Sequence, residues 1–391
     1  MPHHPVTLVE SSAQGAVACI SETAVTVLDG QTGSLLATTH PSSTPTVHHI
    51  PSVPTTSGNI RAAAFSPTGR FFALCTEGKS LLIYDTSAWT LLRHLTSDKR
   101  TNALAFDPLE THVLAGDKFG DCTSIPLDAA HSPSVILGHV SILCALAFTH
   151  TTPPMLLTCD RDEKLRISRY PNAYNIQAFG LGHSEFVTSV AAPRFAPQVC
   201  MTGSGDGSLR LWDVRDGGLL HTVELSSLLQ SYYADGRAEK ADGNSFEDRT
   251  QASERYGVLR VCAAEGLGAF VVVVERFPVV IVLPVEKDGR SLADPLVVDV
   301  QAPPTDMAPT AQGFIVAYAK GPLLADAYVR NKQGAYVRDT LVSEEIARTV
   351  VTREVPEEVQ VPSIYVWGNK MYIERPAGEN SNSNNKNEED D

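Results

Sequence analysis

The fold is decided by the stretch TGSGDGSLRLWD, residues 202–213, together with the pair Gly182-His183 that precedes it. A short apolar run leads into a glycine-rich turn, and a second run follows that ends on Trp212-Asp213. This order predicts two antiparallel strands joined by a tight turn. The glycines do not indicate a nucleotide site, because a strand follows them where a phosphate-binding loop would need the start of a helix.

The same pattern recurs along the chain. Gly138-His139 stands 44 residues before Gly182-His183, and Leu165-Arg166-Ile167 stands 44 residues before Leu209-Arg210-Leu211. Further copies and weaker strand sets occupy residues 16–38, 64–85, 103–121, 258–285 and 296–330. A unit of this length is typical of propellers. We therefore predict an all-β protein, a seven-bladed WD-repeat β-propeller over residues 1–330, with a strand near Pro5 to Glu10 closing the ring with the last blade.

Four segments lack this strand pattern. They are a Pro-, Ser- and Thr-rich surface loop at 39–59, a polar and mobile insertion at 226–256, a C-terminal extension at 331–375 that packs on or closes the propeller, and a disordered acidic tail at 376–391. Within the extension, Glu344 to Arg348 is expected to form a short helix and Tyr365 to Trp367 a strand.

Composition limits the possible functions. Of the 391 residues, 43% are hydrophobic, so a large core is available, and the net charge of −14 argues against a protein that grips nucleic acid unaided. The seven cysteines include no CxxC pair, and we expect them to be reduced and buried in an intracellular protein. No signal peptide and no apolar run long enough for a membrane span is evident.

Four polar or aromatic residues of the best repeat could be misread as a hydrolytic site. They are His183, Ser204, Asp206 and Trp212. We expect them to form a structural hydrogen-bonded chain inside the blade, because a serine hydroxyl used in that way is no nucleophile. We predict no catalytic residue, no cofactor and no metal site.

The preceding repeat departs from this pattern. By the 44-residue offset, Asp160, Asp162 and Ser168 replace Ser204, Asp206 and Trp212, so the usual chain cannot form there. Charged residues instead crowd a tight turn, which is either a solvated turn with weak ion pairs or a docking surface for a protein. The candidate partner-binding residues are Lys118 on the neighbouring turn, Arg161, Asp162, Glu163, Lys164 and Arg166.

Several motifs carry a resemblance to a known family. GDKFGD (116–121), LGHVS (137–141), TCDRDEKLRISRYP (158–171) and LGHSEFV (181–187) resemble, in order and spacing, the non-catalytic WD-repeat subunit of the eukaryotic tRNA (guanine-N7) methyltransferase. The match is dense from about residue 100 to 215.

This resemblance implies a scaffold that does no chemistry. It would bind and stabilise a separate, S-adenosylmethionine-dependent subunit that forms 7-methylguanosine in the tRNA variable loop, as a nuclear heterodimer that meets tRNA only indirectly. In that family the charged turn faces the catalytic subunit, which favours the docking interpretation. Lys164→Glu or Arg166→Glu is then expected to abolish the complex and leave the propeller folded. The alternative is a WD-repeat adaptor of another class, for example in a ubiquitin ligase or chromatin complex.

Overall fold

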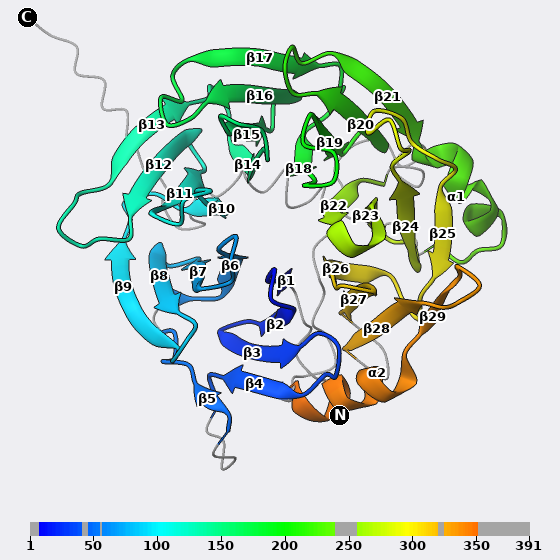
Figure 1. Ribbon diagram of the computed structural model, residues 1–391, viewed down its shortest axis with the longest axis horizontal. Coiled ribbons are helices and arrows are strands. Elements are labelled where there is room, and N and C mark those ends of the chain that lie inside the picture. Colours follow the sequence, from blue (N-terminus) through cyan, green and yellow to red (C-terminus); the bar gives the residue numbers. More distant parts are fainter. Residues whose placement is uncertain (1–7, 41–45, 55–56, 239–255, 320–323, 351–391) are drawn as a thin grey trace, which may run out of the picture.

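Seven antiparallel sheets surround a central axis in the computed structural model, which describes residues 8–40, 46–54, 57–238, 256–319 and 324–350 (Figure 1). The seven-bladed propeller predicted from the repeats is confirmed. The second and third strands of each blade are largely buried because neighbouring blades cover both of their faces, and β23 (Ala269–Val274) is buried along its whole length. The fourth strand of a blade lies on the outer wall and is largely exposed.

The first three blades follow the chain order. The first contains β1 (Leu8–Ser11), β2 (Ala16–Ser21), β3 (Ala24–Asp29) and β4 (Leu35–Thr38), with a short parallel β5 (His48–His49) beside β4. The second contains β6 (Ile60–Phe65), β7 (Phe71–Thr76), β8 (Ser80–Asp85) and β9 (Thr90–Thr96). The third contains β10 (Thr101–Phe106), β11 (His112–Asp117), β12 (Asp121–Pro126) and β13 (Ser134–Gly138).

The other four blades repeat this arrangement. The fourth contains β14 (Leu143–Phe148), β15 (Met155–Asp160), β16 (Lys164–Arg169) and β17 (Ile176–Leu181). The fifth contains β18 (Val187–Ala191), β19 (Val199–Ser204), β20 (Ser208–Asp213) and β21 (Leu219–Glu224). The sixth contains β22 (Val258–Ala264), β23, β24 (Val279–Pro284) and β25 (Leu296–Asp299). The seventh contains β26 (Pro304–Pro309), β27 (Gly313–Tyr318), β28 (Ala325–Arg330) and β29 (Tyr336–Arg338).

The ring does not close as the sequence predicted. β1 is the innermost strand of the first blade, where Leu8 pairs with Ile20, and it is not a strand of the last blade. It nevertheless contacts the last blade, because the backbone N–H of Val9 donates to Oδ2 of Asp306 at 2.8 Å. In the described part of the chain every blade is thus built from its own consecutive strands.

Three charged side chains join the blades beside this seam. Arg260 of the sixth blade lies 2.6 Å from Oε1 of Glu10 in the first blade and 3.2 Å from Oδ2 of Asp306 in the seventh. The carboxylates are largely buried, and burial raises the pKa of both while the guanidinium opposes that rise. The cluster therefore fastens three blades at the inner wall.

Two predicted boundaries were wrong. The segment 296–299 is the outer strand of the sixth blade rather than the beginning of the seventh, and the seventh blade runs past residue 330 to include β29. Apolar periodicity identifies strands but not their place in a blade, and the outer strands carry the weakest apolar signal because one of their faces meets water.

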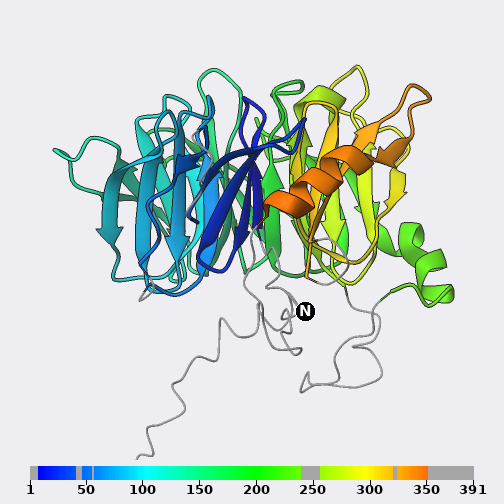
Figure 2. The same cartoon turned by 90° about the horizontal axis from the view of Figure 1, so that it is seen from below.

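The helix expected around Glu344 is longer than predicted. α2 (Thr340–Thr349) begins after Asp339, whose side chain accepts the N–H of Val342 at 3.1 Å. It lies on the outer wall between the first and last blades (Figure 2). Val342 and Ile346 are buried there in one apolar cluster with residues of both blades. Part of the predicted extension therefore covers the seam of the ring.

Two further predicted segments contain helical or buried residues. The insertion begins with α1 (Leu225–Ala234), which buries Leu229 and Tyr232 against the fifth and sixth blades, whereas a mobile segment was predicted. The loop at 39–59 places Ile50 and Val53 in the core. Residues 239–255, the predicted strand at 365–367 and the predicted tail at 376–391 lie outside the described residues. Within the described ranges, no helix has the length and apolar character to cross a membrane.

Candidate partner-binding surface

The predicted partner-binding residues of the two charged turns lie on one face of the ring. Because strands alternate in direction within a blade, the turn between the second and third strands opens on the same face as the linker to the next blade. We call this the BC face. It contains the turns 118–120, 161–163 and 205–207 of the third to fifth blades, and the linkers 139–142 and 182–186.

The fifth blade contains the structural chain that was predicted, with one different member. Nδ1 of His183 lies 2.9 Å from Oδ2 of Asp206, and Nε2 lies 2.8 Å from Oγ1 of Thr202. Trp212 donates its indole N–H to the same hydroxyl at 2.8 Å. Burial would raise the pKa of Asp206, but the hydrogen bond and charge of His183 outweigh it and hold this pKa well below its usual range.

Ser204 is not the hydroxyl of this chain, which corrects the sequence assignment. Its Oγ donates instead to the backbone carbonyl of Glu185 at 3.1 Å. Trp212 pairs with Cys200, so Thr202 is its diagonal neighbour on the same face, whereas Ser204 lies two residues further along the strand. That register is the signal that would have identified Thr202.

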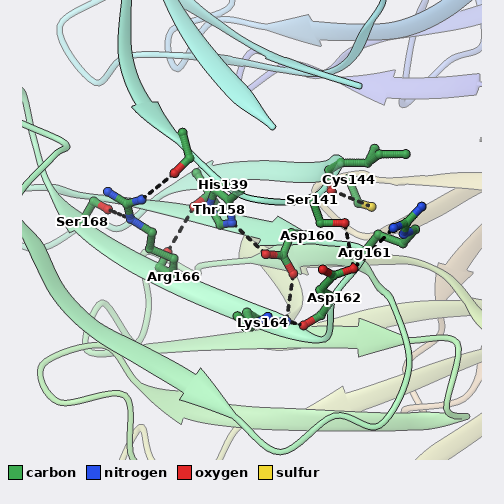
Figure 3. A network of polar contacts seen from close by, with 12 residues as sticks. His139, Ser141, Cys144, Thr158, Asp160, Arg161, Asp162, Lys164, Arg166 and Ser168 are labelled. Carbon is green, nitrogen blue, oxygen red and sulfur yellow. Dashed lines mark hydrogen bonds and ion pairs between the residues drawn. The ribbon is translucent and has the colours of Figure 1, made fainter. Parts of the chain in front are cut away.

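The fourth blade contains a different chain (Figure 3). Nδ1 of His139 lies 2.8 Å from Oδ2 of Asp160, and Nε2 lies 2.7 Å from Oγ1 of Thr158. The His139 and Asp160 side chains are almost completely buried. Asp160, at the end of β15, thus provides the carboxylate that Asp206 provides from the turn in the fifth blade.

Arg166, which the sequence predicts as a partner-binding residue, lies largely inside the blade beside this chain. It is 6% exposed, and its guanidinium donates to Oγ of Ser168 at 2.9 Å and to the carbonyls of Gly138 and Ala173 at 3.0 and 2.8 Å. Burial lowers its pKa, although an arginine stays charged. Ser168, which has the strand register of Trp212, accepts a hydrogen bond from this guanidinium, and the hydroxyl of Thr158 contacts the backbone carbonyl of Arg166 at 3.5 Å.

The remaining charges of this segment lie on the turn between β15 and β16. Oγ of Ser141 donates to Oδ1 of Asp162 at 2.7 Å, and Nζ of Lys164 donates to the carbonyl of Asp162 at 2.9 Å. Asp162 remains 44% exposed, whereas Arg161, 3.5 Å from it, is only 18% exposed. Glu163 is exposed at the tip, with a left-handed φ of 72°.

The buried chain also holds the turn in place. Oδ1 of Asp160 accepts the backbone N–H of Lys164 at 3.1 Å, while its other oxygen contacts His139. Asp162, Glu163 and Lys164 are thereby presented on a fixed backbone. Arg161 contributes less surface.

Lys118 is exposed on the neighbouring turn of the third blade. Its ammonium lies 5.1 Å from the ring centroid of Phe119. The turn is joined to the linker between the blades, because His139 donates its backbone N–H to the carbonyl of Gly120 at 2.9 Å. Ser141 in that linker bonds Asp162, so a hydrogen-bonded path connects both turns.

No reactive centre accompanies these contacts in the described ranges. No group of three or more His, Cys, Asp or Glu residues there is placed to hold a metal ion. The seven cysteines are free thiols, and burial raises the pKa of Cys122 and Cys144 to about 12. What the face offers is charge and shape for another molecule.

Solved structures of other proteins share the propeller fold of this chain. Solved structures entitled "Structure of U3-55K" and "Crystal Structure of Mitotic Checkpoint Complex" each cover 81% of this chain and 88% of theirs, with TM-scores of 0.61 and 0.60 and identities of 14% and 16%. At such identities the likeness supports the propeller fold alone.

Residues 129–322 match the family described as the tRNA methyltransferase TRM82 WD40 domain. The chain is 34% identical over 238 residues to the tRNA (guanine-N(7)-)-methyltransferase non-catalytic subunit wdr4 of Xenopus laevis, covering 60% of this chain and 56% of that protein. It is 39% identical over 173 residues to the human subunit WDR4, covering 44% of this chain and 42% of that protein. The chain thus spans about half the length of the curated relatives it matches. Over these blades the predicted resemblance to the non-catalytic WD-repeat subunits of tRNA (guanine-N7) methyltransferases is confirmed.

Proposed function

We propose that this protein is the non-catalytic scaffold subunit of a heterodimeric tRNA methyltransferase. It binds and stabilises an S-adenosylmethionine-dependent subunit that forms 7-methylguanosine in the tRNA variable loop. The observation that carries the proposal is the similarity, over 129–322, to proteins named as such subunits, together with a fixed charged turn inside that region.

The proposed contact surface is the pair of adjacent turns on the BC face. It consists of Lys118, Asp162, Glu163 and Lys164, with Arg161 at its edge. Charges of both signs on a rigid backbone require a complementary pattern on the partner, so they provide specificity and speed association. Arg166, largely buried beside the fourth-blade turn, is included as a proposed partner-binding residue with little exposed surface of its own.

Net charge supports an indirect route to tRNA. The chain carries −14 overall, and phosphate binding rewards clustered lysines and arginines. We propose that the catalytic subunit handles the RNA and that the complex works in the nucleus.

Reversing one exposed charge tests the contact surface. Lys164→Glu places a carboxylate where the partner offers acidic groups, so the dissociation constant of the reconstituted complex is expected to rise at least tenfold, about 1.4 kcal/mol or more. Calorimetric titration of the purified subunits measures it. The matched control is Lys287→Glu, an exposed lysine between β24 and β25 on the opposite face, which should bind like the wild type.

Two results would overturn the proposal. One is a wild-type protein that does not associate with the methyltransferase subunit. The other is tRNA that keeps its 7-methylguanosine in cells without this protein. A different protein recovered with the propeller would then favour the adaptor class.

A further inference from the structure

The turn 118–120, the linker 139–142 and the end of β17 carry exposed apolar side chains on the BC face, beside the charged residues. Phe119 is 59% exposed, Val140 is completely exposed and Leu181 is 63% exposed. Apolar side chains so open to water gain from being covered by a partner. The charge pattern of the sequence does not reveal them.

These three residues lie among the charged residues of the proposed contact surface. Phe119 directly follows Lys118, and Val140 lies in the linker whose neighbours His139 and Ser141 bond the two turns. Leu181, at the end of β17, is the direct cross-strand partner of Lys164. Directly paired residues in antiparallel strands have neighbouring side chains, so Leu181 and Lys164 share one patch.

The ring of Phe119 is held in its exposed position. Lys118 and Lys99 place their ammonium groups 5.1 and 5.5 Å from its centroid. Lys99 is itself paired with Asp121 and lies 3.6 Å from Asp117. A ring fixed by two cations loses little conformational freedom when a partner covers it, which is the property of a preorganised anchor.

We propose that Phe119, Val140 and Leu181 are the apolar anchors by which this chain grips the catalytic methyltransferase subunit, the charges around them forming the rim. This inference rests on the proposed function. The occupant is a protein surface with an apolar patch bordered by carboxylates that face Lys118 and Lys164. Interfaces with few buried anchors inside a polar rim have this composition, and most of their affinity resides in the anchors.

The test compares two double variants of the full chain with the purified methyltransferase subunit. In Phe119→Ser/Val140→Ser, the dissociation constant is expected to rise about tenfold or more, equally at low and high salt, because burial of apolar surface is not screened. The weakening caused by Lys164→Glu should shrink as salt is added. The control is Leu109→Ser/Leu341→Ser, because both leucines are 80% exposed. Leu109 lies in the turn between β10 and β11 on the opposite face, and Leu341 lies on α2.

Each outcome decides a different point. Equal affinity of wild type and Phe119→Ser/Val140→Ser, alongside a weakened Lys164→Glu, would refute the anchors and leave the proposed function standing. Equal weakening of the control double variant would also refute them, since the effect would then be a general one. A wild-type chain that does not bind the methyltransferase would remove both proposals. Thermal unfolding of all variants checks that the propeller stays folded.

Discussion

The fourth and fifth blades each contain a buried chain of hydrogen bonds around a histidine, but the side chains that surround it differ. Their strands share one register, since Thr158 pairs with Arg166 as Thr202 pairs with Arg210. In the fifth blade an indole and a turn aspartate complete the buried chain, whereas the fourth uses an aspartate at the strand end and places the guanidinium of Arg166 on backbone carbonyls beside the chain. What the fold requires is therefore a buried polar chain with its donors and acceptors paired, rather than particular residues.

The difference changes what each blade presents on the BC face. Asp206 is engaged with His183 and accepts the N–H of Ser184 at 3.0 Å, and its side chain is only 7% exposed. In the fourth blade Asp160 contacts the histidine, so Asp162 at the turn position is 44% exposed. The carboxylate that contacts the histidine thus lies two residues earlier in the fourth blade than in the fifth. The aspartate at the turn position is therefore free to face solvent in the fourth blade.

Removing the buried guanidinium should have the largest effect on stability. Arg166→Met keeps much of the volume but leaves the carbonyls of Gly138 and Ala173 without their donor, so the free energy of unfolding should fall by about 2–4 kcal/mol. Denaturant titration at neutral pH measures it. The control is Arg210→Met at the equivalent position, where Nε is buried with no hydrogen-bond partner in the described structure; its cost should stay below about 1 kcal/mol. Equal costs would contradict an internal role for Arg166.

Replacing the equivalent threonines of the two blades, Thr202 and Thr158, should lower stability by intermediate amounts. Thr202→Val deletes a hydroxyl that contacts both His183 and Trp212, so we expect a loss of about 2 kcal/mol. Thr158→Val deletes one short contact with His139 and a 3.5 Å contact with the carbonyl of Arg166, so about 1 kcal/mol is expected. Both threonines are completely buried, which makes the pair matched, and the order of their unfolding midpoints is the readout.

The aspartates give the smallest effect and a pH dependence. The pKa of Asp206 is lower in the folded than in the unfolded chain, so its contribution is present above about pH 4 and is lost as pH falls towards the folded pKa. Asp206→Asn should therefore destabilise by about 1–2 kcal/mol at pH 7, and the gap to wild type should close in acid. Asp162→Asn should change stability by less than about 0.5 kcal/mol. A gap for Asp206→Asn that is constant from pH 7 to pH 3 would contradict this account.

Sequence alone identified the ring, the charged turn and three members of the fifth-blade chain, but not that Thr202 joins that chain or that Arg166 is buried. The 44-residue offset located the charged turn because repeats preserve spacing. It placed Arg166 with the exposed turn because this residue ends a run of charges, whereas the structure pairs it with the buried Thr158 and leaves it 6% exposed. Phe119, Val140 and Leu181 escaped notice because the exposure of an apolar residue depends on tertiary neighbours rather than on local pattern.

The way the ring closes has a consequence in terms of chain connectivity. Six junctions between blades are bridged by a covalent linker, which keeps the two blades at a high effective concentration even when they part. The junction between the first and last blades has no linker among the described residues and shares no strand. In addition to the direct apolar packing of these two blades, α2 on the outside and Arg260, Glu10 and Asp306 on the inside hold this junction together and so close an otherwise open chain of seven blades.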